Sequence, residues 1–172
     1  FFTLFTITCK GYQNNFENYD KYVWNAMLSY KKGKFNSSLK FFQTAFEIIP
    51  DENSSDYFYA AAAALKLKKD SLAEKFIVES ILNTNTSKNY FKSFIEFNDF
   101  RKNKVLISIE KKYDSLHELF LNKSNNRFLN NEINKLIASD QKVRKKGDNA
   151  LMHHMDSINI NKLIIMAEDD IK

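Results

Sequence analysis

Apolar residues recur every three or four positions along most of the chain, and polar residues fill the positions between them. From Tyr22 to Pro50 this spacing is interrupted once, at the turn Lys32-Gly33-Lys34. It returns from Tyr57 to Leu67 and from Leu72 to Leu82, on either side of a polar turn. A period near 3.6 residues is typical of amphipathic helices, and Gly and Pro mark their ends. The pattern therefore predicts two consecutive pairs of short helices.

Triplets of small and large residues occur at the same place in both predicted pairs, 35 residues apart. They are Ser38, Phe42 and Ala45 in the first pair, and Ala73, Ile77 and Ser80 in the second. With the turn glycine Gly33 and the closing Pro50, the segment from Asn18 to Pro50 resembles the tetratricopeptide repeat. The resemblance implies an all-α solenoid in which Ala61 lies where two helices cross. A plain antiparallel helical bundle with accidental spacing is the alternative.

Helical periodicity continues beyond the second pair, but without the small residues. Lys88 to Phe100 is rich in aromatic residues, and Lys104 to Leu121 is amphipathic. We expect these two helices to form a degenerate third unit that covers the end of the second, as terminal repeats must. Residues 12–122 are thus predicted to form two clear repeats and one degenerate repeat.

A small helical segment is predicted after the polar stretch Asn122 to Asn126, which has the composition of a linker. This segment, residues 127–172, contains two helical patterns separated at Lys146-Gly147-Asp148. We interpret Gly147 as a helix stop and Asp148 as the next N-cap. We expect the segment to continue beyond the end of the chain.

Composition supports the all-α fold and argues against several kinds of site. The chain has three Gly and one Pro in 172 residues, too few for a protein built on tight β-turns. Its single cysteine excludes an intrachain disulfide and a multi-cysteine metal site, and its three histidines form no i,i+4 pair. The formal charge of +5 comes from lysines spread along the chain, which favours a solvated surface over nucleic-acid binding. We expect no catalytic residue, no metal and no cofactor, and leave the oligomeric state open.

Residues 1–11 are predicted to be the remnant of a signal peptide. The first eight, FFTLFTIT, are apolar, uncharged and too few to span a bilayer. Cys9 and Gly11 are small residues at the −3 and −1 positions of a cut before Tyr12. In a less favoured interpretation Cys9 is the lipidated cysteine of a bacterial lipoprotein, although Thr8 suits that motif poorly; a buried first strand or helix turn is the third. Export predicts a bacterial periplasm or cell-envelope location, with no transmembrane helix.

The repeat resemblance implies a concave groove that binds a protein or peptide partner. The groove positions are Val23, Met27, Tyr30 and Lys31 in the first unit, and Phe58, Ala62 and Lys66 in the second. Ordinary packing between neighbouring helices is the alternative for these residues. A mixture of aromatic, Met and Lys side chains suits an extended or helical peptide with some acidic character. The sequence therefore favours an interaction or scaffold module over an enzyme.

Two short motifs follow in the last segment, Asp140-Gln141-Lys142-Val143-Arg144 and Asp156-Ser157-Ile158-Asn159. They resemble an uncharacterised bacterial domain family that bears Asp-Gln-x-x-Arg and Asp-x-x-Asn motifs, and that resemblance implies no activity.

Helical spacing places the polar residues of these motifs beside apolar stripes. Asp140 and Arg144 fall on the apolar stripe of one helix, and Asn159 falls on that of the next, with Asp156 at its edge. We expect Asp140 and Arg144 to form an i,i+4 ion pair, with Asn159, Asp156 or Gln141 supplying further hydrogen bonds. Three interpretations remain: a structural clamp, an open pocket for a small ligand or for catalysis of unknown chemistry, and an exposed cluster.

Overall fold

The computed structural model describes residues 2–50, 53–123 and 126–169, with side chains for residues 15–50, 53–123 and 127–166. Within these ranges every regular element is a helix, and no strand is present. The all-α fold class is thereby confirmed. The chain divides into two compact units, Phe1–Phe120 and Leu121–Lys172.

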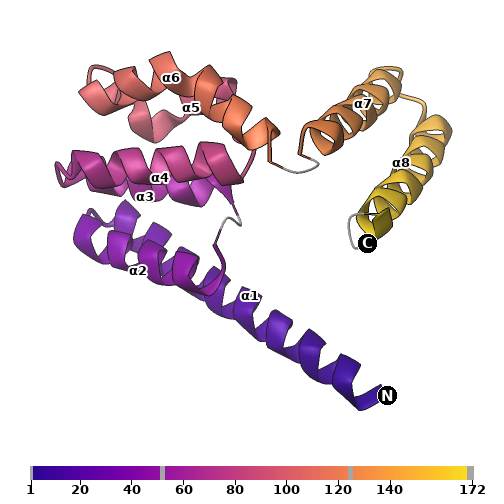
Figure 1. Cartoon of the computed structure of the whole chain (residues 1–172), viewed down its shortest axis with the longest axis horizontal. Coiled ribbons are helices and arrows are strands. Elements are labelled where there is room, and N and C mark those ends of the chain that lie inside the picture. The colour runs from indigo at the N-terminus through magenta and orange to yellow at the C-terminus, as the bar shows by residue number, and fades with distance from the viewer. Residues whose placement is uncertain (1, 51–52, 124–125, 170–172) are drawn as a thin grey trace. The chain divides into compact units, whose positions relative to one another are not determined.

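Successive helices of unit 1 pack on one another in layers (Figure 1). In chain order they are α1 (Phe2–Lys31), α2 (Phe35–Ile48), α3 (Ser54–Lys66), α4 (Asp70–Asn83), α5 (Lys88–Ser93), the 3-10 helix η1 (Ile95–Phe100) and α6 (Lys104–Leu121). Helix α1 packs on α2, α2 on α3 and α3 on α4, and α3 also contacts α1 and η1. Helix α3 therefore lies at the centre of the unit.

Helix α1 starts earlier than the sequence pattern predicts. The repeat pattern places the first helix near Asn18, whereas α1 begins at Phe2 and continues to Lys31. The side chains of the predicted signal-peptide remnant, including Cys9, lie outside the described residues. Within the described part of the chain, no helix is both long and apolar enough to cross a bilayer.

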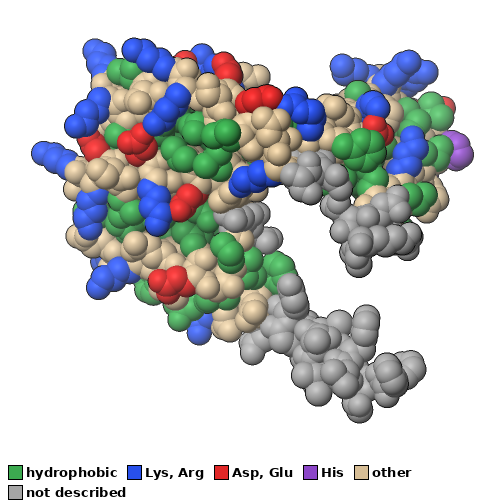
Figure 2. All heavy atoms as spheres, in the orientation of Figure 1, with side chains coloured by type: hydrophobic (Ala, Val, Ile, Leu, Met, Phe, Trp, Pro, Cys, Tyr) green, Lys and Arg blue, Asp and Glu red, His purple; other side chains and the backbone are tan. Residues whose placement is uncertain are grey.

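The turns α1–α2 and α3–α4 have the same backbone geometry, 35 residues apart. Gly33 and Lys68 both adopt the left-handed conformation, with φ of +70° and +57°. The helix before each turn is closed in the same way: the Lys34 amide donates to the Ser29 carbonyl and the Lys69 amide to the Ala64 carbonyl, both at 2.9 Å. This is the Schellman arrangement of a helix C-terminus. Lys and Arg side chains gather along the margin of unit 1 where these turns lie (Figure 2).

The residues of both triplets lie in the core of unit 1. Each one is fully buried: Ser38, Phe42, Ala45, Ala73, Ile77 and Ser80. The alanine run of α3, from Ala60 to Ala64, is also fully buried, because neighbouring helices pack on several sides of α3. The small side chains among them, which are the alanines and serines, let the helix backbones approach closely.

The aromatic segment Lys88–Phe100 is not the single helix that periodicity predicts. Phe94 is extended, with φ −63° and ψ 116°, and separates α5 from η1. The break allows Phe91, Phe94 and Phe97 to surround one ring, that of Phe58, at centroid distances of 6.0, 5.2 and 5.3 Å. In a continuous helix, residues three apart turn by about 300°, so the three rings would spread over about a third of the helix circumference. Tertiary packing therefore overrides the local helical pattern.

Unit 2 contains α7 (Asn126–Arg144) and α8 (Asn149–Asp169), which pack on each other. The turn that follows α7 ends at Gly147, which has a left-handed φ of +68°. The Asp148 carboxylate accepts a hydrogen bond from the Leu151 amide at 3.0 Å. The predicted helix stop and N-cap are thereby confirmed.

Candidate partner-binding site

A cavity of about 350 Å³ opens between α1, α3 and η1. It is lined by Tyr30, Lys31, Gly33, Phe35, Tyr59, Lys66 and Glu96. Three of these, Tyr30, Lys31 and Lys66, are among the predicted groove residues. The end of α1 supplies the first two and the end of α3 supplies the third, so the packing of the two helix pairs creates the cavity.

The wall of the cavity is aromatic and is held by one long-range hydrogen bond. The Tyr30 hydroxyl donates to Glu96 Oε2 at 2.9 Å, and the Tyr30 ring meets the Tyr59 ring edge-on at 5.6 Å. Burial, and then the Glu96 carboxylate, raise the pKa of Tyr30 far above its ordinary value. Burial is also the first cause of the raised pKa of Tyr59. Both phenols therefore stay neutral at physiological pH, and Tyr30 acts as a fixed donor.

The two lysines of the cavity differ in how they are held. Lys66 Nζ lies 2.9 Å from Asp99 Oδ2 and 5.0 Å from the centre of the Phe100 ring. Lys31 is exposed in the last turn of α1 and has no ion pair within the described ranges. The site thus offers one positioned cation and one cation available to a ligand.

The other predicted groove residues do not line this cavity. Val23 and Met27 are partly buried against the core. Phe58 and Ala62 are fully buried, and the rings of α5 and η1 cover Phe58. The repeat resemblance places Phe58 and Ala62 on an open groove, and the full burial of both side chains contradicts that expectation.

Sequence reasoning missed Phe35, Tyr59 and Glu96. Tyr59 follows the predicted groove residue Phe58 directly, so a small change of register would have found it. Glu96 gives no such signal, because it reaches Tyr30 from 66 residues away and lies in a 3-10 helix that no pattern predicts.

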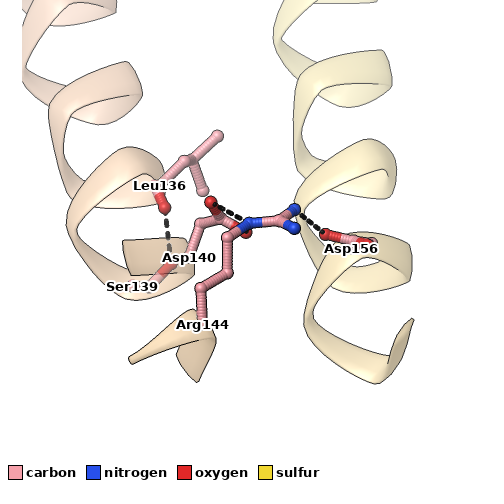
Figure 3. A network of polar contacts seen from close by, with 5 residues as sticks. All are labelled: Leu136, Ser139, Asp140, Arg144 and Asp156. Atoms are coloured by element: carbon pink, nitrogen blue, oxygen red, sulfur yellow. Dashed lines mark hydrogen bonds and ion pairs between the residues drawn. The ribbon is translucent and has the colours of Figure 1, made fainter. Parts of the chain in front are cut away.

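The polar cluster of unit 2 is centred on Arg144 (Figure 3). Its Nε atom donates to both Asp140 carboxylate oxygens, at 2.9 and 2.7 Å, which confirms the predicted i,i+4 pair. Its Nη2 atom donates to Asp156 Oδ1 of α8 at 3.1 Å. Arg144 therefore links the two helices of the hairpin.

This cluster is open to solvent rather than buried. The Arg144 side chain is 50% exposed, and those of Asp140 and Asp156 are 23% and 41% exposed. Hydrogen bonding to Asp140 is the first cause of the raised pKa of Arg144, which stays charged. Gln141 is exposed, and the buried side-chain oxygen of Asn159 has no hydrogen-bond partner. The expectation that Asn159 supplies a hydrogen bond to the cluster is therefore wrong for its side-chain oxygen, which could only accept one.

Fold and site together define a class: an all-α protein whose packed helix pairs form an aromatic cavity with an exposed lysine, Lys31. Among the described residues, no group of His, Cys, Asp or Glu side chains could hold a metal ion. No family model matches the chain, and no curated protein or solved structure matches it significantly.

Proposed function

We propose that the protein is an interaction module that binds a peptide segment of a protein partner in the cavity between α1, α3 and η1. The observation that carries this proposal is the meeting of Tyr30, Lys31 and Lys66, which come from two helix pairs, around one opening. We also propose that the two pairs are tetratricopeptide-like repeats. The turns at Gly33 and Lys68, 35 residues apart, share a left-handed residue and the same closing hydrogen bond, which supports this assignment.

The lining of the cavity suits recognition better than chemistry. Ligand sites of about 300–1,000 Å³ are mostly apolar with a few placed polar groups, and this cavity is of that size. A partner side chain would pack on Tyr30 and Phe35, and its carboxylate would pair with Lys31. Because an exposed ion pair is worth only about 0.2–1 kcal/mol, most of the affinity would come from the aromatic contacts.

Selection from a random peptide library tests this proposal directly, because it does not require the partner to be identified first. Random 12-residue peptides displayed on phage would be selected on the whole chain, and enriched peptides would be measured by fluorescence polarisation. We expect Lys31→Glu to weaken these peptides at least fivefold. Lys40→Glu is the matched control, since Lys40 is an exposed lysine of α2 outside the cavity. Its binding should stay within twofold of the parent.

Two results would argue against the cavity as a peptide-binding site. Failure to enrich any peptide would contradict the proposal that the protein is a peptide-binding module. Enriched peptides that bind Lys31→Glu and Lys40→Glu equally well would place the binding elsewhere on the chain.

The cluster around Arg144 supports no second function. Its guanidinium already has two carboxylate partners, Asp140 and Asp156, which leaves it poorly suited to hold an anionic ligand.

A further inference from the structure

Three turns of unit 1 that lie far apart in the sequence form one continuous surface. We define the turn edge as residues 31–34, 66–70 and 101–104. The first two turns share the cavity described above, which both Gly33 and Lys66 line. A second cavity of about 470 Å³ joins the last two, and it is lined by Lys68, Lys69, Asp70, Ser71, Leu72 and Lys104.

Two contacts of Asp70 hold the second and third turns together. Lys104 Nζ lies 3.7 Å from Asp70 Oδ2. The Asn103 side-chain amide donates to Asp70 Oδ1 at 3.4 Å. The three turns are therefore adjacent in space along one side of unit 1, where Figure 2 shows Lys and Arg side chains gathered.

The turn edge has a larger net positive charge than the entire chain. Its three ranges contain nine Lys and Arg residues and a single carboxylate, Asp70. Even when the adjoining Glu96 and Asp99 are included, the formal charge is +6, against +5 for all 172 residues. Lysines that are dispersed along the sequence thus become concentrated at one surface, where their fields add.

Most of these cations have no partner within the described ranges. Lys66 and Lys104 pair with Asp99 and Asp70, and Arg101 Nη2 donates to the Phe94 carbonyl at 3.1 Å. The remaining six are exposed lysines with no ion pair among the described residues: Lys31, Lys32, Lys34, Lys68, Lys69 and Lys102. An anionic partner would therefore meet charges that the described part of unit 1 does not neutralise.

Features of the turn edge favour carboxylates over nucleic acid. Strong binding of single strands uses exposed aromatic rings on which bases stack, and none of the large exposed apolar side chains of the described residues lies on this edge. The edge has one arginine, and its Nη2 atom already donates to the Phe94 carbonyl and to Asn98 Oδ1, so the pairs of guanidinium donors that include Nη2 are engaged. Leu72 also gives the second cavity an apolar wall.

We propose that the partner segment is acidic, and that a run of Asp or Glu residues crosses the turn edge as it leaves the cavity at Lys31. This inference rests on the proposed peptide-binding function and names the chemistry of the partner. Lys31 belongs to both surfaces, which makes the cavity and the edge continuous. The lysines steer an acidic chain toward the cavity, and the attraction weakens as salt rises.

Fluorescein-labelled decaglutamate is the probe for this inference. The test variant is Lys68→Gln with Lys69→Gln and Lys102→Gln in the whole chain. The matched control removes three exposed lysines away from the edge, Lys40, Lys75 and Lys111, and changes the net charge equally. We expect the edge variant to bind about tenfold more weakly and the control to stay within about twofold. Binding to the parent should fall steeply between 50 and 500 mM NaCl, because the Debye length decreases over this range from above about 10 Å to below it.

The outcomes separate this inference from the cavity proposal. Equal losses for both triple variants would mean that only net charge matters, and would overturn the edge. A ten-nucleotide single-stranded DNA that binds the parent at least tenfold more tightly than decaglutamate, and is lost in the edge variant, would assign the edge to nucleic acid instead. The cavity proposal is tested independently, because the edge variant keeps Lys31 and the selected peptides report on Lys31→Glu. Unchanged thermal melting by circular dichroism would show that each variant is folded.

Discussion

Gly33 and Lys68 hold the same left-handed backbone conformation, but only one of them is glycine. A side chain in this conformation costs about 1–2 kcal/mol, because Cβ crowds the following carbonyl oxygen. Beyond its two chain neighbours, a Cβ atom added at Gly33 would meet no atom within 4 Å, so its cost there would come from the local backbone alone. The two turns thus compare two residue types, glycine and lysine, at one backbone geometry.

We predict that Lys68→Gly raises the free energy of unfolding by about 0.5–1 kcal/mol. Relief of the left-handed strain exceeds the added entropy of glycine in the unfolded chain. The reciprocal change, Gly33→Ala, should lower it by about 1–2 kcal/mol. Urea denaturation followed by circular dichroism measures both. A loss of stability in Lys68→Gly would mean that the Lys68 side chain makes contacts that outweigh its strain.

Ala61 and Ala62 differ in their predicted surroundings but not in their observed burial. The repeat resemblance places Ala61 at a helix crossing and Ala62 toward an open groove, so leucine at Ala62 should cost much less stability than leucine at Ala61. In the structure both are fully buried, because α1, α2, α4 and η1 all approach α3. The repeat resemblance predicts the burial of Ala61, but it does not predict that of Ala62.

Leucine at either alanine should therefore be costly. We predict that Ala61→Leu and Ala62→Leu each lower the free energy of unfolding by about 1–3 kcal/mol through overpacking. Ala138→Leu is the control, since Ala138 is exposed on α7 and has room for a larger side chain. Thermal melts of the three variants decide the matter. If Ala62→Leu melted like the parent, there would be room for a larger side chain at Ala62, as the repeat resemblance implies.

At the scale of elements, local pattern predicts helices well where the chain is regular. The helix pairs around Gly33 and Lys68 follow from apolar spacing and turn residues alone. The split of Lys88–Phe100 into α5 and η1 does not, because its cause is the ring of Phe58, thirty or more residues away in the sequence. The full lining of the cavity could not be predicted from local pattern for the same reason, since Glu96 belongs to η1.

Phe58 should accordingly hold α5 and η1 in place. We predict that Phe58→Ala lowers the free energy of unfolding by about 3–5 kcal/mol, because the rings of Tyr90, Phe91, Phe94 and Phe97 lose their common contact. Ile95→Ala is the control, as Ile95 is 69% exposed on η1. Hydrogen exchange measured by mass spectrometry should show faster exchange across residues 88–100 in Phe58→Ala only. Slow exchange there in both variants would mean that other contacts suffice.

At the scale of the whole molecule, the distribution of charge changes most between sequence and structure. Read along the chain, the lysines of the three turns are short clusters about 35 residues apart, typical of solvated helix ends. Stacking of the helix pairs brings the clusters onto one edge of unit 1. The 35-residue spacing of the clusters predicts that they meet on one edge only if the helix pairs are already known to stack in register.

Unit 2 has much less apolar burial than unit 1, so its polar bridge matters more. Among its described residues, Leu136 and Val143 are the buried apolar side chains, whereas Phe128 and several isoleucines are exposed. Two helices with so small a core are marginal by themselves. The link from Arg144 to Asp140 and Asp156 is one of the few described contacts that orient α8 on α7.

We predict that Arg144→Met speeds hydrogen exchange of the α8 amides, because it leaves Asp140 and Asp156 without their shared cation. Adding Asp140→Asn should recover part of the protection, since it removes one of the two uncompensated carboxylates. The effect should be small and should disappear in 1 M NaCl, where the Debye length is about 3 Å, because the cluster is exposed. Lys142→Met controls for the loss of one cation from the same helix end. A large loss of protection that persists in 1 M NaCl would instead identify a buried clamp, and no change at all would show that the ion pairs do not hold the hairpin together.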